Sequence, residues 1–556
     1  MVVSLRVLLV VAVLSVTVAG NVLSSDKFAV TRSATALNSG GTVMIHSIRA
    51  SRTDCVSPCT VVFSADNVED TASSTDNDWY NLGYYWDYGD STADENYGLY
   101  RRGADYFRDD ANGASREFDT TPLGAHTYLC ESGTCTFHAG LSVRNALGDW
   151  ATDWITITVR SQSVEYPGTS TVCVSSGANY ADCPAGAQQA LALPDYGTWE
   201  NNTRYLLKSG ETHSMDGKCI EFDTDNVLIS SYGTDSFPTL STLLNIGSDS
   251  ANCKDVTPND ATVAGYANPW WISNITLTKL RIREIRLNAS FRNIGLHDID
   301  MNWENEDFGG GIHTSSVDFC SKSQTLTCSN VPLPYGVYMS EVKLVGSRVN
   351  PPGTNVGFWT TSGVSYIAFL NSVAHVAYQH NIRIEGASRV LVAHSDLLGD
   401  HIGKSGKKHK VTIRPEGYRN ADMLNQMRVP SGDKSRVYDS RYIVIADNYI
   451  GTPASVGNAS AIAVMTTNGT VAETVRWGIV DNNTFDLSGG SGDGPSAFDI
   501  RLSGYDLGCY TTNDQEARQG CGDGGQRGIP TGFYNKRLFG EKPVAPDSPG
   551  TYGGFY

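Results

Sequence analysis

The sequence is poor in positive charge: 42 Lys and Arg stand against 59 Asp and Glu, giving a formal net charge of −17 at pH 7. Charge of that sign repels phosphate backbones, so nucleic acid is excluded as a partner. The chain also lacks an amphipathic helical pattern of any length, and after its first 20 residues it lacks an apolar run long enough to cross a bilayer. We therefore expect an all-β protein without a transmembrane segment.

Several catalytic signatures are missing as well. The sequence contains no phosphate-binding loop and no serine-nucleophile elbow. No cysteines are spaced C-x-x-C and no cysteine couple is matched to a pair of histidines, which argues against a zinc site. The 12 cysteines instead form neighbouring couples, which in an exported chain predict up to six local disulfides with open connectivity. The couples are Cys55 with Cys59, Cys130 with Cys135, Cys173 with Cys183, Cys219 with Cys253, Cys320 with Cys328, and Cys509 with Cys521.

The first 20 residues have the layout of a secretory signal peptide. One positive charge, Arg6, precedes an apolar run from Val7 to Val18, and the small residues Ala19 and Gly20 follow. The run is too short to span a bilayer comfortably, while charge, apolar core and small residues in this order are typical of a cleaved leader. We expect residues 1–20 to be removed and the mature protein to be secreted or held at the cell surface.

Residues 42–159 show short alternating strands between turn-forming clusters. The motifs at 86–90 (WDYGD), 126–128 (HTY), 141–145 (LSVRN) and 155–159 (ITITV) follow one another along this segment. With them the segment resembles the PKD domain, an immunoglobulin-like β-sandwich. That resemblance implies an accessory role, as a spacer or as a contact to carbohydrate or another surface. A polar linker with Pro167 and Gly168 occupies residues 160–171.

Residues 172–507 repeat an apolar strand, an Asn/Ser/Gly corner and a second apolar strand. Three such runs begin at Glu341, Ser365 and Arg389, 24 residues apart, and weaker echoes lie at 274–280, 293–301, 441–450 and 476–485. One strand–turn–strand rung per repeat predicts a right-handed parallel β-helix, since leucine-rich repeats need several fixed Leu and propeller blades need about 40 residues. The segment resembles the pectin-lyase-like superfamily, and the order PKD then β-helix resembles exported bacterial proteins of that kind.

Both ends of this predicted β-helix can be placed. Within the resemblance, residues 205–212 look like the first strand that enters it. Residues 508–556 are rich in Gly, Pro and aromatic residues and cannot continue the rungs. We expect this tail to fold over the last coil or along its flank, where it would cover an open strand edge.

Positive charge is densest between residues 380 and 419. Lys408, Lys410 and Arg414 fall on one side of a predicted strand, because side chains alternate along strands. A polysaccharide lyase needs a base and a cation that neutralises the uronate carboxylate. The candidates for catalysis are His401, Lys408, His409, Lys410 and Arg414, with His380 and Arg383 as substrate-binding residues. The alternative is an ordinary solvated face with local ion pairs.

A second constellation is acidic. Asp298 and Asp300 are two residues apart on a predicted strand, so their side chains lie on one face about 7 Å apart. Trp303 follows and could stack on a sugar ring. Two carboxylates at this distance suit a glycoside hydrolase or a Ca²⁺ site. The alternative is a solvated acidic turn.

The motifs of polygalacturonases and pectate lyases are absent, so no catalytic residue of the superfamily transfers to this chain. We predict a secreted carbohydrate-active protein, a polysaccharide lyase ahead of a glycoside hydrolase, that acts on extracellular, anionic polysaccharide. Another class of protein also fits: a non-catalytic polysaccharide-binding adhesin, or a structural surface protein that self-assembles into filaments.

Overall fold

The computed structural model describes the following residues, and every structural statement below concerns them. They are 30–32, 37–38, 42–72, 79, 82–90, 108–109, 114–115, 121–145, 147, 149–216, 218–221, 224–248, 272–287, 291–303, 310–315, 334–346, 357–361, 364–375, 380–398, 409–414, 440–451, 460–465, 475–481, 483–486, 498–501, 510–511, 528–529 and 533–535. The predicted signal peptide lies outside them, as do His401 and Lys408.

The first part of the chain, here called the N-terminal unit, consists of two mainly antiparallel sheets that share one core. Alternation along β13 turns Ile155 into this core and leaves Trp150 and Trp154 outside. Phe63 and Trp86 meet across the two sheets, with ring centroids 5.6 Å apart. The first sheet contains, in spatial order, β1 (Val30–Arg32), β4 (Ile48–Ala50), β6 (Cys59–Ser64) and β11 (Leu123–Tyr128). The second contains β2 (Leu37–Asn38), β13 (Trp150–Arg160), β12 (Thr134–Arg144) and β8 (Gly83–Asp87), with β5 (Asp54–Val56) beside β13.

Short pairs and helices complete this part. β3 (Val43–Ile45) pairs with β7 (Val68–Asp70), and β9 (Arg108–Asp109) pairs with β10 (Ala114–Ser115). Between β13 and the next sheet lie α3 (Gln162–Glu165) and the 3₁₀ turn η2 (Gly168–Ser170). No helix in the described part of the chain is long and apolar enough to cross a membrane.

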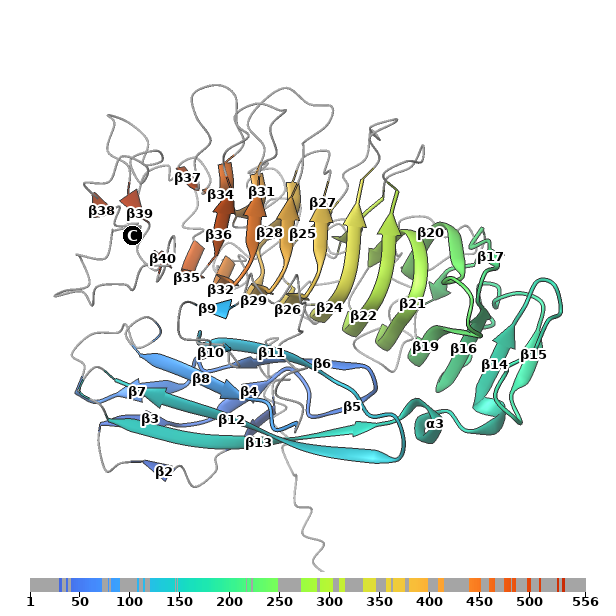
Figure 1. Cartoon of the computed structure of the whole chain (residues 1–556), viewed down its shortest axis with the longest axis horizontal. Helices are drawn as coiled ribbons and strands as arrows, with labels where there is room; N and C mark the ends of the chain where they lie inside the picture. Colours follow the sequence, from blue (N-terminus) through green and yellow to red (C-terminus); the bar gives the residue numbers. More distant parts are fainter. Residues whose placement is uncertain are drawn as a thin grey trace, which may run out of the picture.

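The rest of the chain, here called the coil, forms a single connected sheet of 25 described strands that pair in parallel (Figure 1). In its later part each strand pairs with the third strand after it, so three strands complete one rung. The first sheet of the coil contains β14 (Thr171–Val174), β16 (Thr203–Lys208), β19 (Thr224–Tyr232), β21 (Ile272–Leu287), β22 (Phe291–Asn302), β24 (Tyr335–Val345), β26 (Ser365–Leu370), β29 (Ser388–Ala393), β32 (Ser440–Ala446), β35 (Val475–Asp481) and β40 (Phe533–Asn535).

The other strands form the second and third sheets. The second contains β27 (Val373–His375), β30 (Asp396–Leu398), β33 (Tyr449–Gly451) and β36 (Thr484–Asp486), and the long strands β21, β22 and β24 bend into it. The third contains β23 (Ile312–Ser315), β25 (Phe358–Thr361), β28 (His380–Glu385), β31 (His409–Arg414), β34 (Ser460–Met465) and β37 (Phe498–Arg501). The remaining strands of the early rungs are β15 (Gln188–Ala190), β17 (Thr212–His213), β18 (Ile220–Glu221) and β20 (Thr239–Ser248). β38 (Tyr510–Thr511) pairs separately with β39 (Gly528–Ile529).

Stacked aliphatic side chains fill the coil. Ile294, Val337, Ile367, Val390 and Ile443 pair in register from rung to rung, and all five are buried in one core. Burying such side chains contributes about 1.5–3 kcal/mol each, which is the main reason why the rungs stack. The arrangement is compatible with a parallel β-helix.

The corner between the first and second sheets carries an internal ladder of polar side chains. Ser372 Oγ accepts from the Val342 amide at 3.0 Å, and Ser395 Oγ accepts from the Ser372 amide at 3.1 Å. Asn448 Oδ1 accepts from the Ser395 amide, and Asn483 Oδ1 from the Asn448 amide, both at 3.0 Å. Each corner amide is therefore satisfied by the next rung, although it is buried.

The predictions of an all-β chain and a long parallel sheet are confirmed. So are the disulfides Cys55–Cys59, Cys130–Cys135 and Cys173–Cys183. Cys219 is also disulfide-bonded, and the remaining cysteines lie outside the described residues.

The predicted alignment of the three repeats that begin at Glu341, Ser365 and Arg389 was wrong. Ser365 pairs with Tyr335 and Ser388, not with Glu341, because Glu341 sits at the corner of its rung and not at the start of a strand. The parallel sheet also begins earlier than residue 205, since β14 pairs in parallel with β16.

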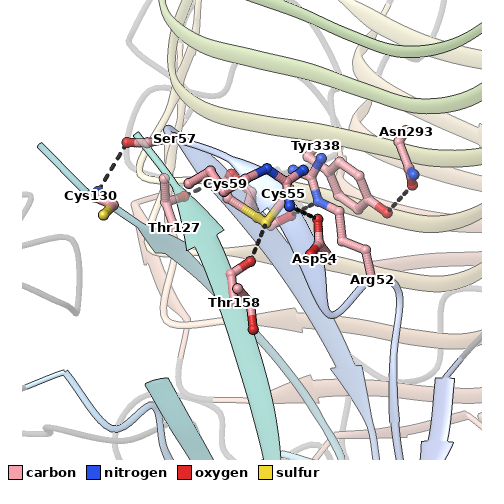
Figure 2. Close-up of a disulfide and its surroundings, with 12 residues drawn as sticks. Arg52, Asp54, Cys55, Ser57, Cys59, Thr127, Cys130, Thr158, Asn293 and Tyr338 are labelled. Atoms are coloured by element: carbon pink, nitrogen blue, oxygen red, sulfur yellow. Dashed lines mark hydrogen bonds and ion pairs between the residues drawn. A yellow bond between two sulfur atoms is a disulfide. The ribbon is translucent and has the colours of Figure 1, made fainter. Parts of the chain in front are cut away.

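The N-terminal unit packs along the first sheet of the coil (Figure 1). A buried ion pair joins Arg389 to Asp66. Arg52 lies beside Tyr338 (Figure 2), and its guanidinium is 4.3 Å from the ring centroid. The Tyr335 hydroxyl donates to the Ser51 carbonyl at 2.7 Å. Apolar side chains of both parts form one further cluster around these contacts, so this face of the coil is covered.

Candidate functional site

Two columns of residues with left-handed backbone run along the coil. The first column includes Tyr366, Arg389 and Tyr442. The second column follows the corner between the first and second sheets. Its members have φ between 50° and 61° although none is a glycine: Lys279, Asp298, Glu341, Asn371, His394 and Asp447. This conformation costs free energy in residues with a side chain, and such residues often mark functional sites.

Three neighbouring rungs bring charged residues together at this corner. Thr278 pairs with His297 and His297 with Ser340, while Leu280 pairs with Ile299, so the residues between these pairs are stacked. Adjacent strands lie about 4.8 Å apart, which places Asp298 next to Glu341 on one side and Lys279 on the other. We call the following set the corner cluster: Lys279, His297, Asp298, Asp300, Glu341 and Lys343.

The two stacked carboxyls hold their protons unusually well. Burial raises the pKa of Asp298, against the opposing effect of Lys279 and Lys343 and with a further contribution from Asp300. Burial also raises the pKa of Glu341, and the charge of Asp298 adds to this shift. Neighbouring carboxyls with raised pKa values keep a proton at a higher pH than ordinary carboxyls do, a property that general acid–base chemistry can use.

His297 lies beside the two acids and is neutral at pH 7. Burial lowers the pKa of His297 to about 4, and Lys279 adds to the effect. Its Nε2 is 4.0 Å from Glu341 Oε2. Its Nδ1 and the Thr278 hydroxyl are buried without a hydrogen-bond partner in the described part of the chain. Buried polar atoms of this kind are rare in structural positions, so a ligand or water is the natural partner.

The sequence pointed to this region but selected a different pair. Asp300 accepts from the Asn302 amide at 2.9 Å and influences Asp298 through its charge, while the acid stacked on Asp298 is Glu341 of the next rung. Sequence reasoning missed Glu341, because 43 residues separate it from Asp298 and only the register between rungs brings them together.

Trp303 differs from the open sugar platform that we expected. Its side chain is buried, and the Arg281 guanidinium lies 4.4 Å from the ring centroid. The ring is therefore already covered by a cation of its own chain.

The basic stretch is not an open charged face in its described part. Lys410 is 0 % exposed, Arg383 is 3 % exposed, and His380 is 4 % exposed. Arg383 is ion-paired with Glu385, and His380 Nδ1 lies 2.9 Å from the Thr412 hydroxyl. Arg383 and Lys410 alternate with the core residues of β28 and β31, so they point outward but are shielded from solvent. Partnering of this kind is what a buried charge requires.

The other candidates of this stretch have no described side chain. β31 includes His409 and Arg414, whose backbones pair with those of His380 and Glu385. His401 and Lys408 lie outside the described residues. Their proposed roles remain predictions.

Metal binding also remains a prediction. In the described ranges no group of three or more His, Cys, Asp or Glu side chains is placed to hold a metal ion. The corner cluster accordingly has two stacked acids and a neutral histidine, a set that suits proton transfer. Comparisons of the chain with protein-family models, with curated proteins and with solved structures found no match, so its function has to be inferred from these residues.

Proposed function

We propose that this protein is exported and hydrolyses glycosidic bonds of an extracellular polysaccharide at the corner cluster. The observation that carries this proposal is the stacking of Asp298 on Glu341, two carboxyls whose pKa values are both raised by burial. Glycoside hydrolysis needs one protonated and one ionised carboxyl on either side of the scissile bond.

The roles follow from the surroundings. The protonated acid would donate to the glycosidic oxygen, and the ionised acid would act as nucleophile or activate water. Neutral His297 could hydrogen-bond a sugar hydroxyl through its free Nδ1. Lys279 and Lys343 would attract a carboxylate or sulfate on the sugar, which fits an anionic polysaccharide.

The rest of the chain supports an exported protein of this class. Three local disulfides are typical of oxidising compartments. In this proposal residues 1–20 are a signal peptide, the coil is a right-handed β-helix of the pectin-lyase-like kind, and the N-terminal unit is a PKD-like module. A calcium ion held by acidic side chains and a polysaccharide carboxylate belongs to the proposal as well.

One observation favours elimination as the second candidate chemistry. A lyase needs a neutral base beside a cation, and His297 with Lys279 offers that combination. A third outcome is binding without catalysis, as in an adhesin or a self-assembling surface protein.

The test is incubation of the purified protein with anionic and neutral polysaccharides, with and without Ca²⁺. Release of reducing ends should be lost in Asp298→Asn and in Glu341→Gln. The matched control is Glu221→Gln, because burial also raises the pKa of Glu221, which lies on β18 away from the corner. If the protein produces the ultraviolet absorbance of an unsaturated uronate, and His297→Gln abolishes it, the reaction is elimination and not hydrolysis. Activity that survives Asp298→Asn, Glu341→Gln and His297→Gln, or no activity on any polysaccharide, would refute a catalytic corner.

A further inference from the structure

The outer face of the second sheet of the N-terminal unit displays aromatic side chains. Trp150, Trp154 and Tyr85 are 44 %, 42 % and 41 % exposed. Trp150 and Trp154 share one face of β13 because four residues separate them. Tyr85 joins the same face, since it pairs with Ser142 of β12, which pairs with Thr152 between the two tryptophans.

The sheet is shaped to let an indole lie on it. A Cβ atom at Gly140 would come within 3.0 Å of Trp154 Cδ1 and Nε1, so the indole edge lies directly over this glycine. Between the aromatic residues, the hydroxyls of Ser142 and Thr152 are 2.8 Å apart. The result is a broad surface of rings and hydroxyls on a regular sheet, where a bulky side chain would otherwise project.

The aromatic side chains of this face are partly exposed to solvent, whereas the opposite sheet packs against the coil. The sheet that contains β6 and β11 packs on the coil, and β12 and β13 lie on the far side of the unit (Figure 1). The N-terminal unit therefore presents its aromatic face away from the coil and away from the corner cluster.

Charge narrows the choice of partner. Among the described residues beside the aromatic side chains, Arg144 and Asp87 are exposed and carry opposite charges, in a chain whose net charge is −17. At this face an anionic polymer would meet the negative net charge of the chain, and the described residues here form no positive patch to offset it, unlike Lys279 and Lys343 at the corner cluster. A second copy of the chain would meet the same repulsion. A neutral partner would meet no electrostatic repulsion.

We propose that the aromatic face formed by Tyr85, Trp150 and Trp154 binds the surface of a neutral, insoluble polysaccharide. The C–H faces of sugar rings are apolar and stack on exposed aromatic rings, while the hydroxyls at the ring edges bond to polar groups such as Ser142 and Thr152. Exposed aromatic residues grouped on one flat face, unlike scattered ones, mark interaction surfaces. This binding is independent of hydrolysis at the corner cluster.

The test is retention of the full-length protein by insoluble neutral polysaccharides, such as cellulose and chitin particles, measured over a range of protein concentrations. Trp150→Ala combined with Trp154→Ala should weaken retention at least tenfold. Gly140→Ala should give a smaller loss, because it keeps both tryptophans but lifts the Trp154 indole from the sheet. Leu129→Ala is the matched control: Leu129 is 60 % exposed but lies beyond the end of β11.

Asp298→Asn separates this proposal from the proposed hydrolysis, because it should leave retention unchanged whether or not it abolishes activity. Thermal melting of each variant controls for folding, and quenching of tryptophan fluorescence by soluble oligosaccharides gives a second measure of binding. Three results would overturn the proposal: no retention of the unaltered protein, retention that the double tryptophan variant leaves intact, or retention by anionic polysaccharides alone. A change of oligomeric state in the double variant without a change in retention would assign the face to a second copy instead.

Discussion

Each of the two left-handed columns of the coil recurs at one position of successive rungs, and the two columns have the same backbone conformation. Their surroundings differ. The first column includes Tyr366, Arg389 and Tyr442, with φ of 59°, 54° and 55°. Each of these side chains points toward the N-terminal unit or toward a neighbour in its column: Arg389 pairs with Asp66, and the Tyr442 ring lies 4.9 Å from Trp79. The N-terminal unit therefore supplies contact partners for side chains of this column.

In the described part of the chain, no such unit covers the charged rungs of the second column. Lys279 is exposed, and Asp298 and Glu341 are half-buried with raised pKa values. The same backbone geometry thus serves two purposes. In the first column the unusual conformation lies at the contact between two parts of the chain, and in the second column it presents the charged groups of the corner cluster.

The largest effect is expected from breaking the first column. Asp66→Ala should remove a buried counter-charge of Arg389 and lower the free energy of unfolding by about 3–5 kcal/mol. Chemical denaturation measures this. Asp54→Ala is the control, since the Asp54–Arg160 pair is exposed and should contribute less than about 1 kcal/mol. Equal, small losses in the two variants would show that the Arg389–Asp66 contact does not join the two parts.

The next largest effect concerns the second column and the loss of folding stability at low pH. Because burial lowers the pKa of His297 to about 4, the folded protein binds fewer protons than the unfolded chain between that value and 6.5. Stability should therefore fall as the pH drops through this window, by at most about 3 kcal/mol from this group. Denaturation midpoints from pH 7 to pH 4 should decline less steeply in His297→Gln, whereas exposed His138→Gln should follow the unaltered protein. Parallel curves for all three proteins would contradict the assignment.

The general architecture was predictable because it depends on local periodicity. Apolar strands and Asn or Ser corners predicted stacked rungs, and proximity predicted the three disulfides that are described. The contact between Arg389 and Asp66 was not predictable, since 323 residues separate them and neither lies in a recognisable motif. The same is true of Asp298 and Glu341, because the turns between rungs differ in length and hide the register. Lys410 was placed on an open face because alternation gives the direction of a side chain but not what covers it.

The smallest effect has an unusual sign. At neutral pH and above, Asp298→Asn and Glu341→Gln should raise the melting temperature. The reason is that a protein with a carboxyl of raised pKa loses stability as the pH rises through that pKa. The gain should vanish in acid, where the unaltered carboxyls are protonated. Functional residues commonly carry such a cost in stability.

Glu211→Gln provides the opposite control for these variants. Hydrogen bonds from Ser175 and Ser176 outweigh burial and lower the pKa of Glu211, so its ionised form stabilises the folded protein. This variant should therefore melt earlier at neutral pH. If Asp298→Asn and Glu341→Gln also melt earlier, the two acids are structural and the corner cluster loses its electrostatic argument.

The Ser/Asn ladder has a consequence for how such a protein can change. From β26 onward the corner that carries the ladder keeps one length: Leu370 to Val373, Ala393 to Asp396, Ala446 to Tyr449 and Asp481 to Thr484. The two other corners vary freely, for β31 ends at Arg414 and the next rung starts only at Ser440. One fixed seam therefore leaves two edges open to insertion, and long insertions add little entropic cost. New recognition loops could be grafted there, by evolution or by design, without resetting the register of a single rung.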